Sequence, residues 1–169
     1  KVTDHDLYNN QKDVMSDGPF TIIPSEVCKL RCIDFEDLSL GTMYYVGDTF
    51  TDSGVPITVE DFQWSSGGWT SDGYTDVQNS GSAGGSGQEM RINNVNLDFG
   101  FGSSWDGLSL LYGEYGGNLN IRINGDFQNF ENFSDIHATS IGGVNVSVVD
   151  LGGGKGVLKL FGTINSFAI

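Results

Sequence analysis

Residues 118–126 read Asn-Leu-Asn-Ile-Arg-Ile-Asn-Gly-Asp. Leu119, Ile121 and Ile123 alternate with polar residues, which is typical of a β-strand with one face buried and the other in solvent. The Asn-Gly pair that follows favours a tight turn, because both residues tolerate positive φ. This stretch therefore predicts a strand that ends in a hairpin turn.

The same unit recurs through most of the chain as an alternating or apolar run followed by a cluster of Gly, Asn, Asp or Ser. The runs span residues 42–46, 57–64, 89–99, 108–112, 118–124, 145–149 and 157–167. Strands at this spacing predict an all-β fold, an antiparallel two-sheet sandwich of the jelly-roll type.

Four further segments complete the structural prediction. Residues 32–38 are expected to form a strand, with Ile33, Phe35 and Leu38 buried, and a bulge is expected at 93–94. The Gly-rich residues 65–87 are expected to form a loop. Residues 127–133 are expected to form a helical turn or a crossing loop, with helix elsewhere only at 25–32.

The domain organisation follows from a change of composition near the start. Residues 1–24 are polar and show neither the two-residue alternation of a strand nor the 3.6-residue period of a helix. We therefore treat them as an arm, followed by one β-sandwich domain over 25–169. Residues 20–23, Phe-Thr-Ile-Ile, stand between prolines and could form a strand. We expect an open sheet edge to be completed when this segment, or the C-terminal run 167–169, adds to a neighbouring subunit. The alternative is that the arm folds back on its own domain.

The charge balance excludes two classes of partner. The 169 residues carry 22 acidic and only 8 basic side chains, a formal net charge of −14. The basic residues are scattered, so no stripe exists to bind nucleic acid or an anionic membrane surface. No run approaches the ~20 apolar residues of a membrane span, so no membrane insertion is expected. The composition and two Asn-x-Ser sequons favour an extracellular or cell-surface protein glycosylated at Asn132 and Asn145.

Two cysteines, Cys28 and Cys32, are separated by three residues. In an extended chain their Cα atoms would lie ~13 Å apart, beyond disulfide reach, so a local bridge requires a turn. The alternatives are two free thiols, or a cysteine paired with a segment outside this sequence. The spacing fits neither a thioredoxin-like redox motif nor a four-ligand zinc site.

Several motifs together resemble those of a known family. They are Asp-Phe-Glu-Asp-Leu at 34–38, Val-Gly-Asp-Thr-Phe-Thr at 46–51, Ala-Gly-Gly-Ser-Gly-Gln-Glu at 83–89, Tyr-Gly-Glu-Tyr-Gly-Gly-Asn-Leu at 112–119 and Ile-Asn-Gly-Asp at 123–126. The chain resembles, over roughly residues 32–169, secreted bacterial proteins with a jelly-roll domain similar to carbohydrate-binding modules and concanavalin-like lectins. The resemblance implies one structural calcium, for which Glu36 in the first body strand supplies a carboxylate. The candidate ligands among the acidic residues are Asp34, Glu36 and Asp37, or Asp48 with Asp52, or Asp72 with Asp76.

The best ligand candidate is a loop that carries exposed aromatic residues. Sugars stack their C–H faces on aromatic rings while carboxylates and amides bind the hydroxyls. The candidate ligand-binding residues are Trp64, Trp69, Asp72, Tyr74 and Asp76. The alternative is that these aromatic side chains only close the edge of the sandwich.

No motif in the sequence has the spacing of a catalytic site, so we do not expect an enzyme. The acidic, Gly-rich β-body and the distinct arm favour an extracellular structural or adhesive protein, the self-assembling subunit of a filament or surface layer. The alternative is a carbohydrate-binding module that uses Trp64, Trp69 and Tyr74.

Overall fold

The computed structural model describes residues 31–169. The predictions for the arm at 1–24, for strand addition by 20–23, for most of the turn at 25–32 and for Cys28 lie outside the described residues. They stay predictions.

The described part is all β apart from one short 3-10 helix, η1 (Phe133–Ile136), and every strand pair is antiparallel. The prediction of an antiparallel all-β fold is confirmed. None of the helical structure within residues 31–169 has the length and apolarity of a membrane span.

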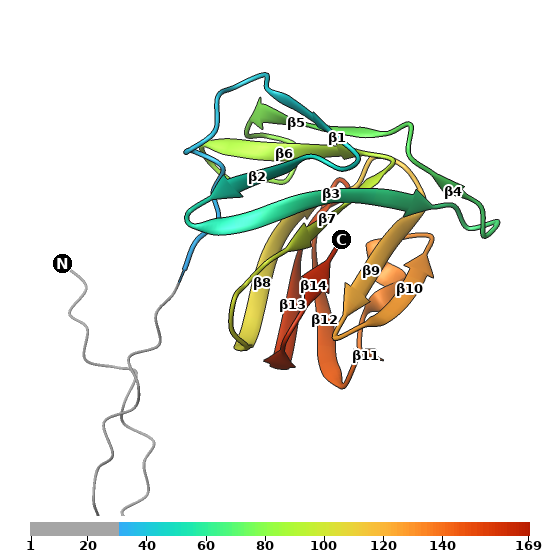
Figure 1. The fold of residues 1–169 in the computed structure, drawn as a ribbon. Helices are drawn as coiled ribbons and strands as arrows, with labels where there is room; N and C mark the ends of the chain where they lie inside the picture. Colours follow the sequence, from blue (N-terminus) through green and yellow to red (C-terminus); the bar gives the residue numbers. More distant parts are fainter. Residues whose placement is uncertain (1–30) are drawn as a thin grey trace, which may run out of the picture. The chain divides into compact units, whose positions relative to one another are not determined.

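The strands form three sheets rather than the two expected (Figure 1). The largest has the order β10 (Asp126–Phe130), β9 (Leu119–Ile123), β14 (Phe167–Ala168), β7 (Val95–Phe99), β3 (Val55–Gln63), β2 (Thr49–Asp52), and β4 (Trp69–Thr70) also pairs with β3. The four-stranded sheet has the order β11 (Ser140–Ile141), β12 (Val144–Gly152), β13 (Lys155–Ile164), β8 (Trp105–Gly113). The three-stranded sheet has the order β1 (Met43–Tyr45), β5 (Tyr74–Asn79), β6 (Gln88–Asn93).

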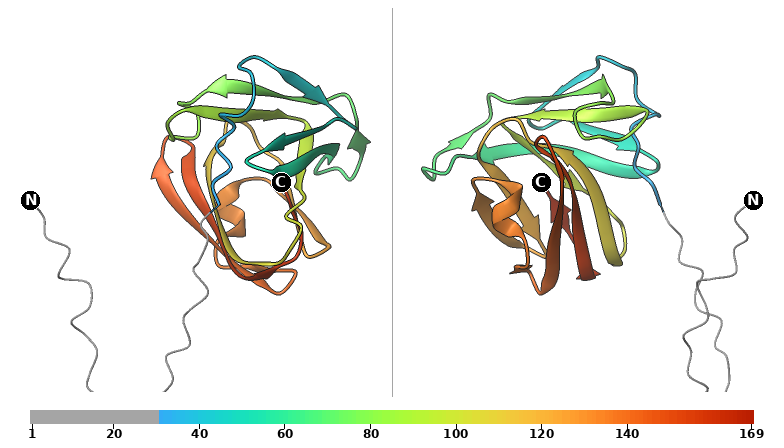
Figure 2. Two further views of the ribbon diagram at one scale, coloured as in Figure 1. Left: turned by 60° about the vertical axis from the view of Figure 1, so that its left-hand side comes forward. Right: turned by 180° about the vertical axis from the view of Figure 1, so that it is seen from behind.

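One hydrophobic core joins the three sheets. The largest sheet contributes its alternate residues, such as Ile57, Leu97 and Ile121, and the four-stranded sheet contributes Leu158 and Leu160; all are at most 1% exposed. The three-stranded sheet, at the top of both views in Figure 2, adds its partly buried side chains Tyr44 and Met90 to the same core. The result is a sandwich-like body in which three sheets surround one core.

The C-terminal strand β14 lies inside the largest sheet. Phe167 pairs with Phe99 of β7 on one side and with Ile123 of β9 on the other. Both backbone edges of β14 are therefore occupied within the molecule. The C-terminal run, one of the two segments expected to add to a neighbour, therefore pairs within its own molecule.

The strand expected at 32–38 is absent. Phe35 has φ of 61°, in the left-handed region, and Leu38 N–H donates to the Phe35 carbonyl in a turn. The inward side chains were correctly identified, because Ile33, Phe35 and Leu38 pack against the core. The alternation was too irregular to distinguish a turn from a strand.

The Gly-rich residues 65–87 are not a single loop. They contain β4 and β5, and Thr75 and Val77 of β5 are buried. At 93–94, where a bulge was expected, the chain leaves β6 and enters β7 of another sheet through Asn94, whose φ is 54°. Residues 127–133 lie in β10 and at the start of η1, so a strand and a 3-10 turn replace the expected helix or crossing loop.

Glu89 of β6 binds the backbone of the glycine-rich loop that joins β5 to β6. Its carboxylate accepts the backbone N–H groups of Gly81, Ser82 and Ala83 at 3.0–3.2 Å. Burial raises the pKa of Glu89, but the hydrogen bonds from Ala83, Ser82 and Gly81 outweigh it, so the pKa falls below its ordinary value of 4.5. The ionised carboxylate therefore stabilises the folded loop.

We expect Glu89→Gln to lower the free energy of unfolding by about 1–2 kcal/mol at neutral pH, since an amide forms weaker bonds with these donors. Because the pKa is depressed on folding, the carboxylate contributes fully above 4.5 and its contribution is lost as the pH falls through the folded value. Urea unfolding of both proteins checks this. The difference between them should shrink at about pH 3, and an equal difference at both pH values would contradict the assignment.

Candidate functional site

The outward side of the largest sheet collects polar side chains from strands that are distant in sequence. Alternation places Glu60 of β3, Asp98 of β7 and Arg122 of β9 on this side, because their neighbours Val59, Leu97 and Ile121 are buried. We call this region the polar face and define it by Glu60, Trp69, Asn96, Asp98, Asn120, Arg122 and Phe127. Between these strands, β14 contributes only the small side chain of Ala168, which leaves a shallow depression at the centre of the polar face.

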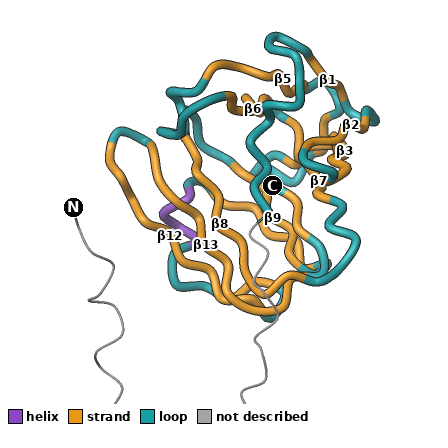
Figure 3. The backbone as a smooth tube through the Cα atoms, turned by 90° about the vertical axis from the view of Figure 1, so that its left-hand side faces the viewer, coloured by secondary structure: helices purple, strands orange, loops and turns teal. Residues whose placement is uncertain are grey.

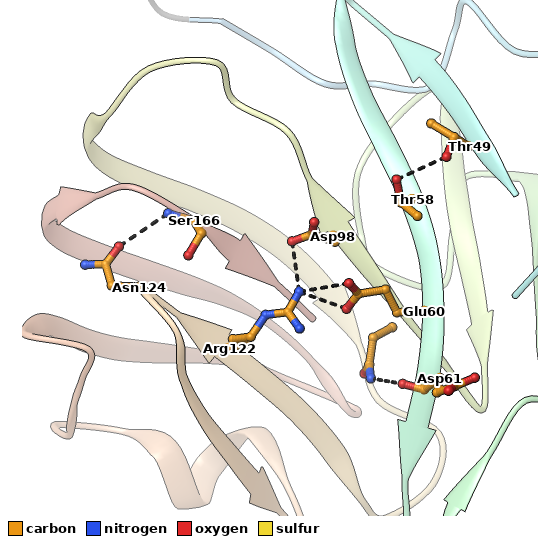
Figure 4. A network of polar contacts seen from close by, with 9 residues as sticks. Thr49, Thr58, Glu60, Asp61, Asp98, Arg122, Asn124 and Ser166 are labelled. Carbon is orange, nitrogen blue, oxygen red and sulfur yellow. Dashed lines mark hydrogen bonds and ion pairs between the residues drawn. The ribbon is translucent and has the colours of Figure 1, made fainter. Parts of the chain in front are cut away.

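Arg122 links the two sides of β14. Its Nη2 atom lies 3.0 and 2.8 Å from the two carboxylate oxygens of Glu60 and 3.1 Å from Oδ1 of Asp98 (Figure 4). All three side chains are about one-third exposed. The hydrogen bond to Glu60 is the main cause that raises the pKa of Arg122, so the guanidinium stays charged. This network fixes the positions of two carboxylates and a guanidinium at the surface.

Side-chain amides form the second part of the polar face. Asn96 and Asn120 are 5% and 3% exposed, and Asn96 Nδ2 donates to Asn120 Oδ1 at 3.2 Å. The Nδ2 groups of Asn118, Asn120 and Asn129 converge on the Gln63 carbonyl. Asn96 Oδ1, by contrast, is buried without a hydrogen-bond partner. Asn96 and Asn120 both line the surface hollow beside Trp69, so their amides are available for polar contacts at its edge.

An exposed aromatic pair borders the amides. The turn before β4 brings Trp69 back along β3, with Gly67 at φ 88° and a Trp64 N–H bond to the Gly68 carbonyl. The Trp69 ring lies 5.5 Å from the ring of Phe127 and remains 57% exposed. Trp69 and Phe127 line a hollow of about 20 Å³ together with Glu60, Asn96, Asn120, Arg122 and Ala168. The site is thus a surface platform rather than a deep pocket.

The five predicted ligand-binding residues do not all belong to this platform. Trp69 lines the hollow, whereas the exposed Trp64 packs edge-on against Phe62. Asp76 is 7% exposed and forms an ion pair with Arg91, whose Nε lies 2.7 Å from its Oδ1. Tyr74 accepts a hydrogen bond from the same arginine, and Asp72 is exposed.

The predicted calcium ligands Asp34, Glu36 and Asp37 are exposed and already accept backbone N–H bonds. Asp37 binds the N–H of Ser53, and Glu36 binds that of Gln88 at 2.7 Å. Within residues 31–169, no three His, Cys, Asp or Glu side chains gather as a metal site. The calcium stays a prediction.

The other predicted modification sites differ in accessibility. Asn145 is exposed on β12, which suits a glycan acceptor. Asn132 caps η1, where its N–H and amide donate to Asp135 at 2.9 and 3.4 Å. Cys32 is exposed, while Cys28 lies outside the described residues, so their pairing stays a prediction.

No family model, curated protein or solved structure matches the chain. The assignment of the site therefore depends on its own geometry. Sequence reasoning missed Glu60, Asn96, Asp98, Asn120, Arg122 and Phe127 as members of one site. The alternation indicated that Asn120 and Arg122 face outward, but no sequence signal placed β9 near β3.

Proposed function

We propose that the polar face binds a carbohydrate. The observation that carries this proposal is the exposed Trp69 ring, which lines one hollow together with the amides of Asn96 and Asn120. An aromatic ring binds the C–H face of a sugar, and nearby amides and carboxylates bind its hydroxyls. The polar face offers both kinds of contact.

The charges on the polar face favour a neutral sugar. Glu60 and Asp98 together carry two negative charges against the single positive charge of Arg122. A uronic acid or sulfated sugar would meet net repulsion, whereas hydroxyl groups can donate to the carboxylates and accept from the guanidinium. The shallow hollow suits a chain that passes along the surface.

On this proposal the protein is an extracellular binding domain of the jelly-roll type that does not catalyse a reaction. This agrees with the resemblance to carbohydrate-binding modules. The proposed site differs from the loop expected from the sequence. Its aromatic part includes Trp69 but neither Trp64 nor Tyr74. Self-assembly into a filament or surface layer stays a prediction, as residues 20–23 lie outside the described residues.

Trp69→Ala is expected to abolish retention of a neutral polysaccharide, with affinity reduced by roughly 10-fold to 100-fold, since aromatic stacking supplies much of such binding. A glycan array identifies the ligand, and titration calorimetry with that glycan gives the change. The matched control is Trp64→Ala, which removes an exposed tryptophan that does not line the hollow.

A second variant separates stacking from hydrogen bonding. Asn96→Leu removes the amide from the hollow together with its Nδ2 bonds to Asp61 and Asn120. We expect it to weaken binding, and thermal unfolding of the same variant measures the structural cost of the lost bonds separately. Equal loss in Trp64→Ala and Trp69→Ala, or no glycan bound by the wild type, would refute the proposal.

A further inference from the structure

A larger cavity lies on the inner side of the four-stranded sheet. It has a volume of about 450 Å³ and is formed where β8 ends, along β12, at the β12–β13 turn and beside η1. η1 lies against β12, as Figure 3 shows. The lining residues are Tyr112, Glu114, Asn132, Ser134, His137, Val148, Asp150, Gly153 and Gly154.

The sheet register explains the shape of this cavity. Asp150, Gly156 and Tyr112 lie in one row across β12, β13 and β8. Gly156 has no side chain, and an added Cβ there would overlap the Tyr112 hydroxyl. The Tyr112 ring therefore lies flat over β13, with the Phe133 ring of η1 stacked on it at 3.7 Å. Tyr112 thus gives the cavity an aromatic side, with Phe133 packed against the same ring.

The lining carries negative charge without a compensating cation. Glu114 and Asp150 are the charged lining residues, and neither Lys nor Arg lines the cavity. His137 Nδ1 accepts the Val148 N–H at 3.0 Å. Burial raises the pKa of Glu114, and the charges of Asp135 and Glu131 raise it further. A ligand that brings positive charge would relieve this repulsion.

Glu114 also has free hydrogen-bonding capacity. Its Oε2 accepts the Phe133 N–H at 3.3 Å, but its Oε1 is buried and has no partner. Asp150 uses Oδ1 to accept the Gly152 N–H at 2.7 Å. A donor bound in the cavity beside Glu114 would give this carboxylate a further hydrogen bond.

We propose that this cavity binds a small organic cation through a primary ammonium group, with Glu114 and Asp150 as its anionic partners. The Tyr112 ring and Val148 supply apolar surface for the carbon atoms next to the ammonium. A metal ion fits less well, because the cavity is far larger than the ~10–15 Å³ that one water needs and calcium needs six to eight oxygens. The inference does not depend on the carbohydrate proposal.

The test is a titration of the protein, labelled with nitrogen-15, with butylammonium chloride, followed by the amide signals of Gly153 and Gly154. We expect saturable shifts with butylammonium and none with 1-butanol, which has the same carbon chain without the charge. Glu114→Gln and Asp150→Asn should each weaken binding by about tenfold or more. The matched control is Asp106→Asn, an exposed carboxylate on β8 that does not line the cavity.

Each alternative outcome would overturn the inference. Equal shifts with 1-butanol would indicate an apolar cavity only. Shifts with calcium chloride but not with butylammonium would indicate a metal site. Absence of any shift, or equal weakening in Asp106→Asn, would exclude a specific cation site. If Glu114→Gln is unfolded, Asp150→Asn alone decides.

Discussion

Phe167→Ala is expected to lower the free energy of unfolding by about 3–5 kcal/mol, the largest loss we expect from a single substitution. The Phe167 side chain is 1% exposed and stacks on Phe99 with ring centroids 5.7 Å apart. It projects from β14, which pairs with strands on both sides, so the surrounding sheet cannot easily collapse into the cavity left behind.

Urea or thermal unfolding measures this loss, and Phe161→Ala is the matched control. Phe161 lies on β13 but is 55% exposed, so its removal should cost about 1 kcal/mol or less. A similar loss in both variants would mean that β14 does not occupy the centre of the sheet.

Gly142→Ala is expected to lower the free energy of unfolding by about 3 kcal/mol, from two causes that add. Gly142 has φ of 56°, and an L-residue in the left-handed region costs about 1–2 kcal/mol. An added Cβ would also overlap the carbonyl oxygen of Ile123, which belongs to the backbone of β9. Forcing this contact apart costs about 1–3 kcal/mol more.

The neighbouring glycine separates the two causes. Gly143 has φ of 78°, but an added Cβ there meets nothing within 4 Å. Gly143→Ala should therefore cost only the conformational part, about 1–2 kcal/mol. Thermal unfolding of the two variants checks the difference, and equal melting temperatures would show that Gly142 does not contact β9.

Strands with regular alternation could be predicted from the sequence. Residues 118–126 form β9 and its turn as expected, with Ile123 opposite Asp126 and positive φ at Asn124 and Gly125. β5 was missed, because its alternation is interrupted by polar residues and preceded by Gly73. Its stability comes from pairing with β1 and β6, which local sequence does not report.

The candidate site was only partly predictable. The exposed Trp69 was identified by residue type and turn context, and it is the platform's most exposed aromatic ring. The polar partners could not be identified, because Glu60 and Arg122 are 62 residues apart and meet only through β14 and β7. Alternation gives the face of a residue but not the order of strands in a sheet.

The position of β14 also has a consequence for the order of folding. Without β14 the largest sheet would be two separate ribbons, one of β2, β3 and β7 and the other of β9 and β10. Each ribbon can form from hairpins or nearby strands. The two ribbons join only when β14 pairs with both of them at once, at Phe99 and at Ile123, and this pairing closes long loops of the chain. Such distant contacts are slow to form, so we infer that docking of β14 is a late step that makes the sheet cooperative.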